Sequence, residues 1–283
     1  MGIIDFHVHT FPDAIAEKAI AGMQRNSHAA AFGSGTVSGL LETMEKAGVS
    51  RSVVLPVATN PLKIASINTV SIEASREKLT YFGAMHPHAE NWKEELNRLH
   101  AAGVPGIKIH PQYQGTDITD IRYLRILDHA AGLGLLTVMH AGDEIAYPGV
   151  VRCSPEMVRS VCDQLGNIPL VLAHMGGWKN WDRVADLLGP TGCMLDTALS
   201  LGIIVPQEPG HYREEELPLL EEGAFCALVR AFGADRILFG TDSPWADQKA
   251  EAERIRSMPL TEAEKENILW KNAKELLELT ADS

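Results

Sequence analysis

Two histidines and an aspartate stand at alternate positions near the start of the chain, within an apolar run. Asp5, His7 and His9 are each separated by one residue. Residues two apart on a β-strand project from the same face, which predicts that these three side chains line one side, opposite Phe6 and Val8. Imidazole is a favoured ligand of zinc, iron, nickel and copper. The pattern alone fits a metal site or a structural role, so the case for a metal depends on the rest of the chain.

The elements that must position these residues follow a regular alternation of strand and helix. We predict strands at residues 3–10, 52–57, 79–85, 106–110, 135–140, 169–174, 193–197 and 236–242. Helical sequence follows each strand, at 15–24, 40–47, 64–78, 92–102, 121–133, 155–165, 181–188 and 217–231, and a final helix begins at Thr261 with a capping box completed by Glu264. Residues 23–39 and 200–216 are predicted to form long loops.

Eight strand and helix units favour an α/β fold with a single (β/α)₈ TIM barrel over residues 1–283. The alternative is a doubly wound open sheet. It is disfavoured because no glycine-rich G-x-G-x-x-G segment follows the first strand.

Composition narrows the class of partner. The 37 acidic and 25 basic residues give a net charge of −12, which disfavours nucleic acid and anionic membrane surfaces and leaves a small-molecule substrate. No apolar run is long enough to span a bilayer, and no secretory leader is present, so we expect a cytoplasmic protein. The four cysteines show no metal-binding or disulfide spacing, which predicts reduced thiols. The oligomeric state stays open, a homo-oligomer included.

Polar side chains end five of the eight predicted strands. They are His7, His9, Lys108, His110, His140, His174 and Asp242. Active sites of parallel barrels lie at the carboxyl ends of the strands. Strand alternation places His140 on the face of Leu136 and Val138, and Asp242 on the face of Leu238. We therefore expect these residues to meet at one point although they are distant in sequence.

Six motifs together resemble a known family. They are Asp-Phe-His-Val-His at 5–9, Gly-Ile-Lys-Ile-His-Pro at 106–111, His-Ala-Gly at 140–142, Ala-His-Met-Gly-Gly at 173–177, Phe-Gly-Thr-Asp-Ser-Pro at 239–244 and Ile-Leu-Trp-Lys-Asn-Ala at 268–273. In these motifs the chain resembles the amidohydrolase superfamily, and within it the metal-dependent hydrolases and decarboxylases similar to aminocarboxymuconate semialdehyde decarboxylase. The resemblance covers the whole chain in order.

The resemblance implies a divalent metal ion, with zinc as the first expectation. The implied ligands are His7, His9, His140 and Asp242. His174 would orient a metal-bound water or polarise the substrate. Asp242, touching metal and water, would carry the proton. Asp5 is interpreted as support, one pleat below His7, fixing the orientation of a ligand.

Lys108 has two interpretations. In binuclear relatives a lysine at the end of the fourth strand is carboxylated and bridges two metals. In the branch that this chain resembles most, one metal is usual, and Lys108 would be a free ammonium facing substrate anions. We favour one metal. His110 would contact substrate or cap its strand.

Hydrolysis is our first hypothesis for the reaction. A metal-activated water would attack a small carboxylated or cyclic substrate. The alternative is metal-dependent decarboxylation of a carboxylated aromatic or a semialdehyde. A third possibility, ligand binding without catalysis, is disfavoured because the ligand set is intact.

Overall fold

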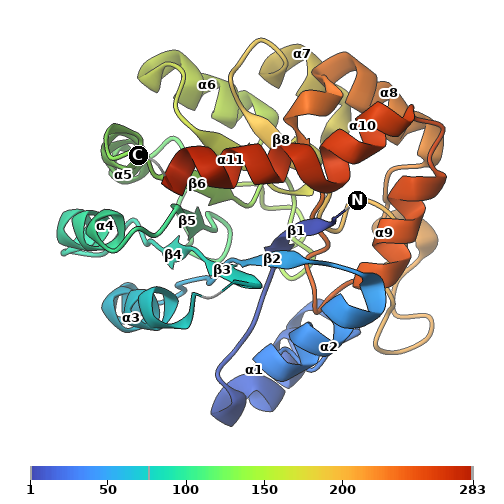
Figure 1. Cartoon of the computed structure of the whole chain (residues 1–283), viewed down its shortest axis with the longest axis horizontal. Helices are drawn as coiled ribbons and strands as arrows, with labels where there is room; N and C mark the ends of the chain where they lie inside the picture. Colours follow the sequence, from blue (N-terminus) through green and yellow to red (C-terminus); the bar gives the residue numbers. More distant parts are fainter. Residues whose placement is uncertain (1, 76, 282–283) are drawn as a thin grey trace.

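Parallel β-strands alternate with α-helices in the computed structural model, which describes residues 2–75 and 77–281 (Figure 1). One run of paired strands is β1 (Ile4–Val8), β2 (Arg51–Val54) and β3 (Leu79–Tyr81). The second run is β4 (Gly83–Ala84), β5 (Gly106–Ile109), β6 (Leu136–Met139), β7 (Leu170–Leu172), β8 (Met194–Asp196) and β9 (Ile237–Leu238). All pairings are parallel and follow the chain order.

Backbone hydrogen bonds join the two runs at both ends. Phe82 alone separates β3 from β4, and its N–H donates to the carbonyl of Val54 in β2 at 3.0 Å. At the other end the N–H of Phe6 in β1 donates to the carbonyl of Phe239 beyond β9 at 2.7 Å. Since β3 and β4 act as one strand, eight strands run around the molecule, and the predicted TIM barrel is confirmed.

Helices surround these strands. They are α1 (Asp13–Ser27), α2 (Val37–Ala47), α3 (Ile64–Ala74), α4 (Trp92–Ala101), α5 (Ile121–Gly132), α6 (Pro155–Leu165), α7 (Val184–Leu188), α8 (Glu222–Phe232), α9 (Gln248–Ser257), α10 (Glu262–Glu266) and α11 (Asn272–Ala281). The predicted capping box of Thr261 and Glu264 opens α10. No helix in the described part of the chain is long and apolar enough to cross a membrane.

Two apolar layers hold the barrel together. The outer layer packs strand residues such as Ile107 and Leu172 against the surrounding helices. The inner cluster fills the barrel with Phe6, Leu136 and other strand residues, and Ala273 and Leu277 of α11 complete it. In Figure 1, α11 accordingly runs across the strands and not alongside them.

A bulge in β1 overturns one prediction about side-chain direction. The pairing of β1 with β2 shifts register between Asp5 and Val8. Phe6 therefore belongs to the inner cluster, while Asp5 contacts Gln248 of α9 on the outer side of the barrel. The expectation that Asp5 shares a face with His7 and His9, opposite Phe6, is wrong, because a bulge reverses the alternation.

Three segments differ from the predicted elements. Helix α9 was not predicted, because it carries few apolar residues, and its start is fixed by the Asp247 side chain, which accepts from the N–H groups of Lys249 and Ala250. Helix α1 extends to Ser27, so the predicted loop at 23–39 is shorter. The predicted strand at 236–242 is limited to β9, and Asp242, at the end of the predicted range, has a φ of 64°, outside the strand region.

Candidate metal centre

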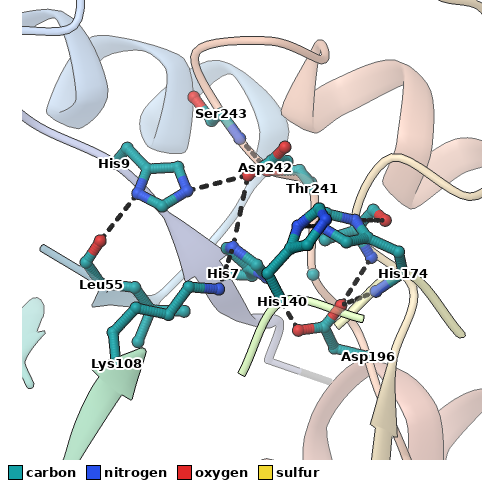
Figure 2. A network of polar contacts seen from close by, with 12 residues as sticks. His7, His9, Leu55, Lys108, His140, His174, Asp196, Thr241, Asp242 and Ser243 are labelled. Carbon is teal, nitrogen blue, oxygen red and sulfur yellow. Dashed lines mark hydrogen bonds and ion pairs between the residues drawn. The ribbon is translucent and has the colours of Figure 1, made fainter. Parts of the chain in front are cut away.

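His7, His9 and Asp242 converge at the carboxyl end of the barrel strands (Figure 2). The Nε2 atom of His9 lies 2.9 Å from Oδ1 of Asp242, and Nε2 of His7 lies 3.3 Å from the same oxygen. One donor atom from each of the three residues lies within 4.8 Å of the others. These are three of the four residues that the sequence predicts as ligands.

Both imidazole rings are oriented through their second nitrogen. Nδ1 of His9 donates to the carbonyl of Leu55 at 2.7 Å, and Nδ1 of His7 lies 2.8 Å from Oδ2 of Asp196. A carbonyl only accepts, so Nδ1 of His9 carries the proton. Each ring thus presents Nε2 to Asp242, the arrangement by which partners outside a metal site fix its histidine ligands.

Asp196 is a site residue that the sequence reasoning missed. It is fully buried at the end of β8, and its Oδ1 accepts from the N–H groups of His174 and Ala198 at 3.1 and 3.0 Å. Burial works to raise the pKa of Asp196, but the interactions with His7, His174 and Lys108 outweigh it and lower the pKa. The available signal was an aspartate ending an apolar strand, as at the other site positions.

The backbone around Asp242 is shaped for the site. Its φ of 64° lies in the left-handed region, which aspartate tolerates better than most residues. The N–H of Asp242 donates to the carbonyl of His7 at 2.8 Å. Burial works to raise the pKa of Asp242, but His7 and His9 outweigh it and hold the pKa far below its ordinary value. Asp242 is therefore an anionic donor at the centre.

Asp5 supports this arrangement through the backbone and not through an imidazole ring. Its carboxylate accepts from the N–H of His7 at 3.2 Å and from the N–H and hydroxyl of Thr241 at 3.0 and 2.6 Å. It also accepts from Gln248 at 2.8 Å. Burial raises the pKa of Asp5 to about 7. Asp5 thus ties β1 to the segment that carries Asp242.

Lys108 is buried beside the three converging residues. Its Nζ lies 3.2 Å from Nε2 of His7, and Figure 2 shows it reaching toward that ring from β5. Burial lowers the pKa of Lys108 to about 8, against the opposing effect of Asp196 and Asp242. The side chain of Lys108 therefore lies buried beside the candidate metal ligands, and which of its two interpretations holds stays a prediction.

His140 lies next to the three converging residues but in a different group. Its Nδ1 is 3.0 Å from Nε2 of His174, whose own Nδ1 donates to the carbonyl of Ala198 at 2.8 Å. The ring of His110 stacks on His140 with centroids 4.1 Å apart. Burial lowers the pKa of all three histidines, so these rings are neutral.

Glu144 and Tyr113 complete this second group. Oε2 of Glu144 lies 3.7 Å from Nε2 of His110 and 3.8 Å from Nε2 of His140, and the Tyr113 hydroxyl donates to Oε1 at 3.1 Å. His110, His140 and Glu144 also place donor atoms within 4.8 Å of one another. The parallel stacking of the two rings keeps their lone pairs from pointing at one common ion, so this group is a poorer candidate for a metal.

A pocket of about 560 Å³ opens above both groups. The predicted site residues that line it are His7, His9, Lys108, His110, His140, His174 and Asp242; Asp5 lies outside it. The walls are largely apolar and include Leu55, Val57, Trp178 and Leu199. The indole Nε1 of Trp178 is buried and has no hydrogen-bond partner in the described part of the chain.

The donor set of the three converging residues fits a divalent ion. Two imidazole nitrogens and one carboxylate, with their orienting hydrogen bonds on the far side, are ligands suited to zinc and similar metals. Burial lowers the pKa of His7 to about 4, with Lys108 adding to the effect, so this ring is neutral at pH 7. A neutral imidazole is the form that binds metal.

Three solved structures illustrate the likeness to known proteins. An uncharacterised TIM-barrel protein from Bordetella bronchiseptica has 19% identity, coverage of 99% of both chains and a TM-score of 0.74. A dihydroxybenzoic acid decarboxylase from Polaromonas, with bound manganese and the inhibitor 2-nitroresorcinol, has 15% identity, coverage of 98% of this chain and 97% of that chain, and a TM-score of 0.68. A protein from Pseudomonas putida, provisionally described as 2-pyrone-4,6-dicarboxylic acid hydrolase, has 17% identity, coverage of 98% of both chains and a TM-score of 0.66.

Several further structures of this fold are described as decarboxylases. No curated protein matches the chain. The sequence model of the amidohydrolase family matches residues 4–279, which is nearly the whole chain. The protein is therefore a member of the amidohydrolase family and an enzyme of that metal-dependent superfamily.

Proposed function

We propose that this enzyme is a metal-dependent decarboxylase of a small carboxylated aromatic compound. The observation that carries the proposal is the setting of the converging His7, His9 and Asp242, with Lys108 beside them, at the floor of a largely apolar pocket. In an apolar pocket a carboxylate loses its hydration, which raises its free energy. Neutral CO₂ does not carry this penalty, so the setting favours loss of CO₂. The decarboxylases of similar fold, among them the one from Polaromonas, support the same reaction.

One divalent ion is proposed, held by His7, His9 and Asp242 with His140 as the fourth ligand. Zinc and manganese both suit this set of nitrogen and oxygen donors. When bound, the ion would anchor a substrate oxygen and withdraw electron density from the ring. All four residues line the pocket, so a bound substrate can reach them.

The chain's own residues position the substrate and move the proton. We assign the Lys108 ammonium to hold the carboxylate, because this lysine is buried, lines the pocket and lies next to His7. The bond between the ring carbon and the carboxylate breaks, CO₂ leaves, and the electron pair stays on the ring carbon. That carbon takes up a proton that comes from water, and Asp242 or His174, the two proton carriers assigned here, would relay it.

Hydrolysis of a cyclic ester is the second candidate. It is favoured by the structure from Pseudomonas putida, which has the same fold and a hydrolase description. The same donors would activate a water, and Asp242 would accept its proton.

The test combines metal content with product analysis. Metal is measured by elemental analysis of purified protein, and CO₂ release from dihydroxybenzoates and 5-carboxyvanillate is compared with acid release from cyclic esters. We expect about one ion per chain and CO₂ release. Asp242→Asn and His174→Asn should lower the rate roughly 10²-fold or more. His100→Asn, an exposed position on α4, is the control. Acid release without CO₂ would establish the hydrolase, and a chain without metal would refute both.

A further inference from the structure

The pocket is larger than a carboxylated ring requires. An apolar cavity of roughly 150 Å³ is enough to hold one benzene ring. The pocket has a volume of about 560 Å³, so a ring seated over His7 and Asp242 leaves most of it unfilled. Helix α1 and the segment that follows β8 both contribute residues to the lining of the pocket.

One face of α1 forms a wall of the pocket that is apolar in its middle, with the polar Lys18, Asn26 and Ser27 also among its lining residues. Ile15, Ala19 and Met23 are spaced four residues apart, so they share one face of the helix, and all three line the pocket. Gly22, on the neighbouring row, also lines it. Ile15 is 51% exposed, so it lies where the wall meets solvent.

A second wall of the pocket is hydrogen-bonded to the end of α1. Leu199 and Ile204 line the pocket from the segment after β8. In this segment the carbonyl of Val205 accepts from the N–H of Ala30 at 2.7 Å, and the Tyr212 hydroxyl donates to the carbonyl of Ser27 at 2.6 Å. These bonds join the two walls, so the space between them is formed before any ligand binds.

We propose that the substrate is a carboxylated ring bearing an extended apolar substituent, which lies between α1 and the segment after β8. This inference rests on the proposed function for the ring and its carboxylate. The substituent is assigned from the apolar lining residues Ala19, Met23 and Leu199: burying an apolar chain against them removes apolar surface from water on both partners, whereas a polar chain would lose hydration there.

Gly22 offers a variant that fills this space without disturbing the helix. A Cβ atom added at Gly22 would lie 3.8 Å from Nη2 of Arg25, its nearest side-chain neighbour. Gly22→Leu also replaces a poor helix former with a good one, so the variant should fold. Ala19→Phe is a second blocking variant. Ala14→Leu, at an exposed position on the same helix and outside the pocket, is the matched control.

Binding is measured by calorimetry with benzoates that carry alkyl groups of none, two, four or six carbons at position 4. We expect the Kd of the wild type and of Ala14→Leu to fall roughly four-fold per methylene. In Gly22→Leu and Ala19→Phe the Kd should be independent of chain length, and benzoate itself should bind as in the wild type. The inference would be overturned if the wild-type Kd did not change with alkyl chain length. It would also be overturned if longer alkyl chains lowered the Kd of both blocking variants as much as that of the wild type.

Turnover of the matching 4-alkyl-2-hydroxybenzoates separates this inference from the proposed function. If binding depends on alkyl chain length but no CO₂ is released, the apolar site is supported and the decarboxylase is refuted. CO₂ release from 2-hydroxybenzoate, with no effect of alkyl chain length on binding, would support the decarboxylase and refute the apolar site.

Discussion

The orientation of His7 depends on a single carboxylate. Asp196 holds the Nδ1 side of the ring while also accepting two backbone N–H groups, so its position is fixed from three directions. Asp196 is 0% exposed, and no water can take over these contacts. The histidine ligand is therefore presented in one orientation before any metal binds.

Replacing Asp196 with asparagine should weaken metal binding without unfolding the barrel. The amide keeps the shape of the side chain but loses the charge. Its NH₂ group must also face one of the N–H groups that donate to the carboxylate in the wild type. Loss of such an orienting partner typically weakens metal binding roughly 10- to 100-fold. Metal Kd, measured by competition with a chelating dye, checks this. Asp186→Asn, on α7, serves as the control, and an unchanged Kd for Asp196→Asn would contradict the assigned role.

The state of Lys108 distinguishes a site with one metal ion from a site with two. If Lys108 is a free ammonium, Lys108→Met should keep one ion per chain and lose affinity for carboxylated substrates, roughly 10-fold or more in KM since a charged hydrogen bond contributes about 1.5–3 kcal/mol. Metal analysis beside a KM measurement tests this, with the exposed Lys46→Met as control. A loss of metal in Lys108→Met would instead support a carboxylated lysine that bridges two ions.

At the scale of elements, helix α5 begins with a charged cap. The Asp120 side chain accepts from the N–H of Arg122 at 2.9 Å and forms an ion pair with the Arg122 guanidinium at 2.6 Å. These contacts hold the pKa of Asp120 well below its ordinary value of 3.8. A carboxylate with a lowered pKa stabilises the fold above its unfolded pKa, and this contribution is lost as the pH falls through the folded pKa.

Asp120→Ala should therefore lower the free energy of unfolding by about 1 kcal/mol at pH 7, the usual effect of losing an N-terminal cap. Asp120→Asn keeps the cap and should lose less. Urea unfolding at pH 7 and pH 3 measures both. The difference between wild type and Asp120→Asn should shrink at pH 3, because below about pH 4 the unfolded wild type binds a proton at Asp120 that the folded state does not bind. A difference that grows at low pH would contradict this account.

The sequence predicts the barrel and the convergence of the site better than the direction of single side chains. Apolar alternation correctly places Leu136, Val138 and Leu238 inside the barrel. It fails for Asp5 and Phe6, because an inserted bulge leaves no mark in the pattern of apolar residues. The hydrogen bond between His7 and Asp196 spans 189 positions, and only the three-dimensional arrangement reveals it. The likeness of the motifs shows the family but leaves the substrate open.

At the scale of the whole molecule, the metal should stabilise the fold. An ion that binds only the native state adds about 2.7 kcal/mol at a concentration 100 times its Kd. For a chain of this size that corresponds to a rise in Tm of roughly 4–5 °C. Thermal unfolding before and after chelation, then after addition of zinc or manganese, measures the rise. His7→Ala and Asp242→Asn should show little of it, and a full rise in both variants would place the ion elsewhere.

The closure of the barrel between β1 and the segment after β9 has a consequence for biosynthesis. His9 and Asp242 meet across 233 positions, so the histidines emerge from the ribosome first and the aspartate emerges near the end of the chain. At roughly 5–20 residues per second the interval is on the order of 10–50 s. During this time one edge of β1 has no partner strand, and the nascent chain holds two imidazoles but lacks the carboxylate between them. Tight metal uptake should therefore begin only after translation of the barrel is complete.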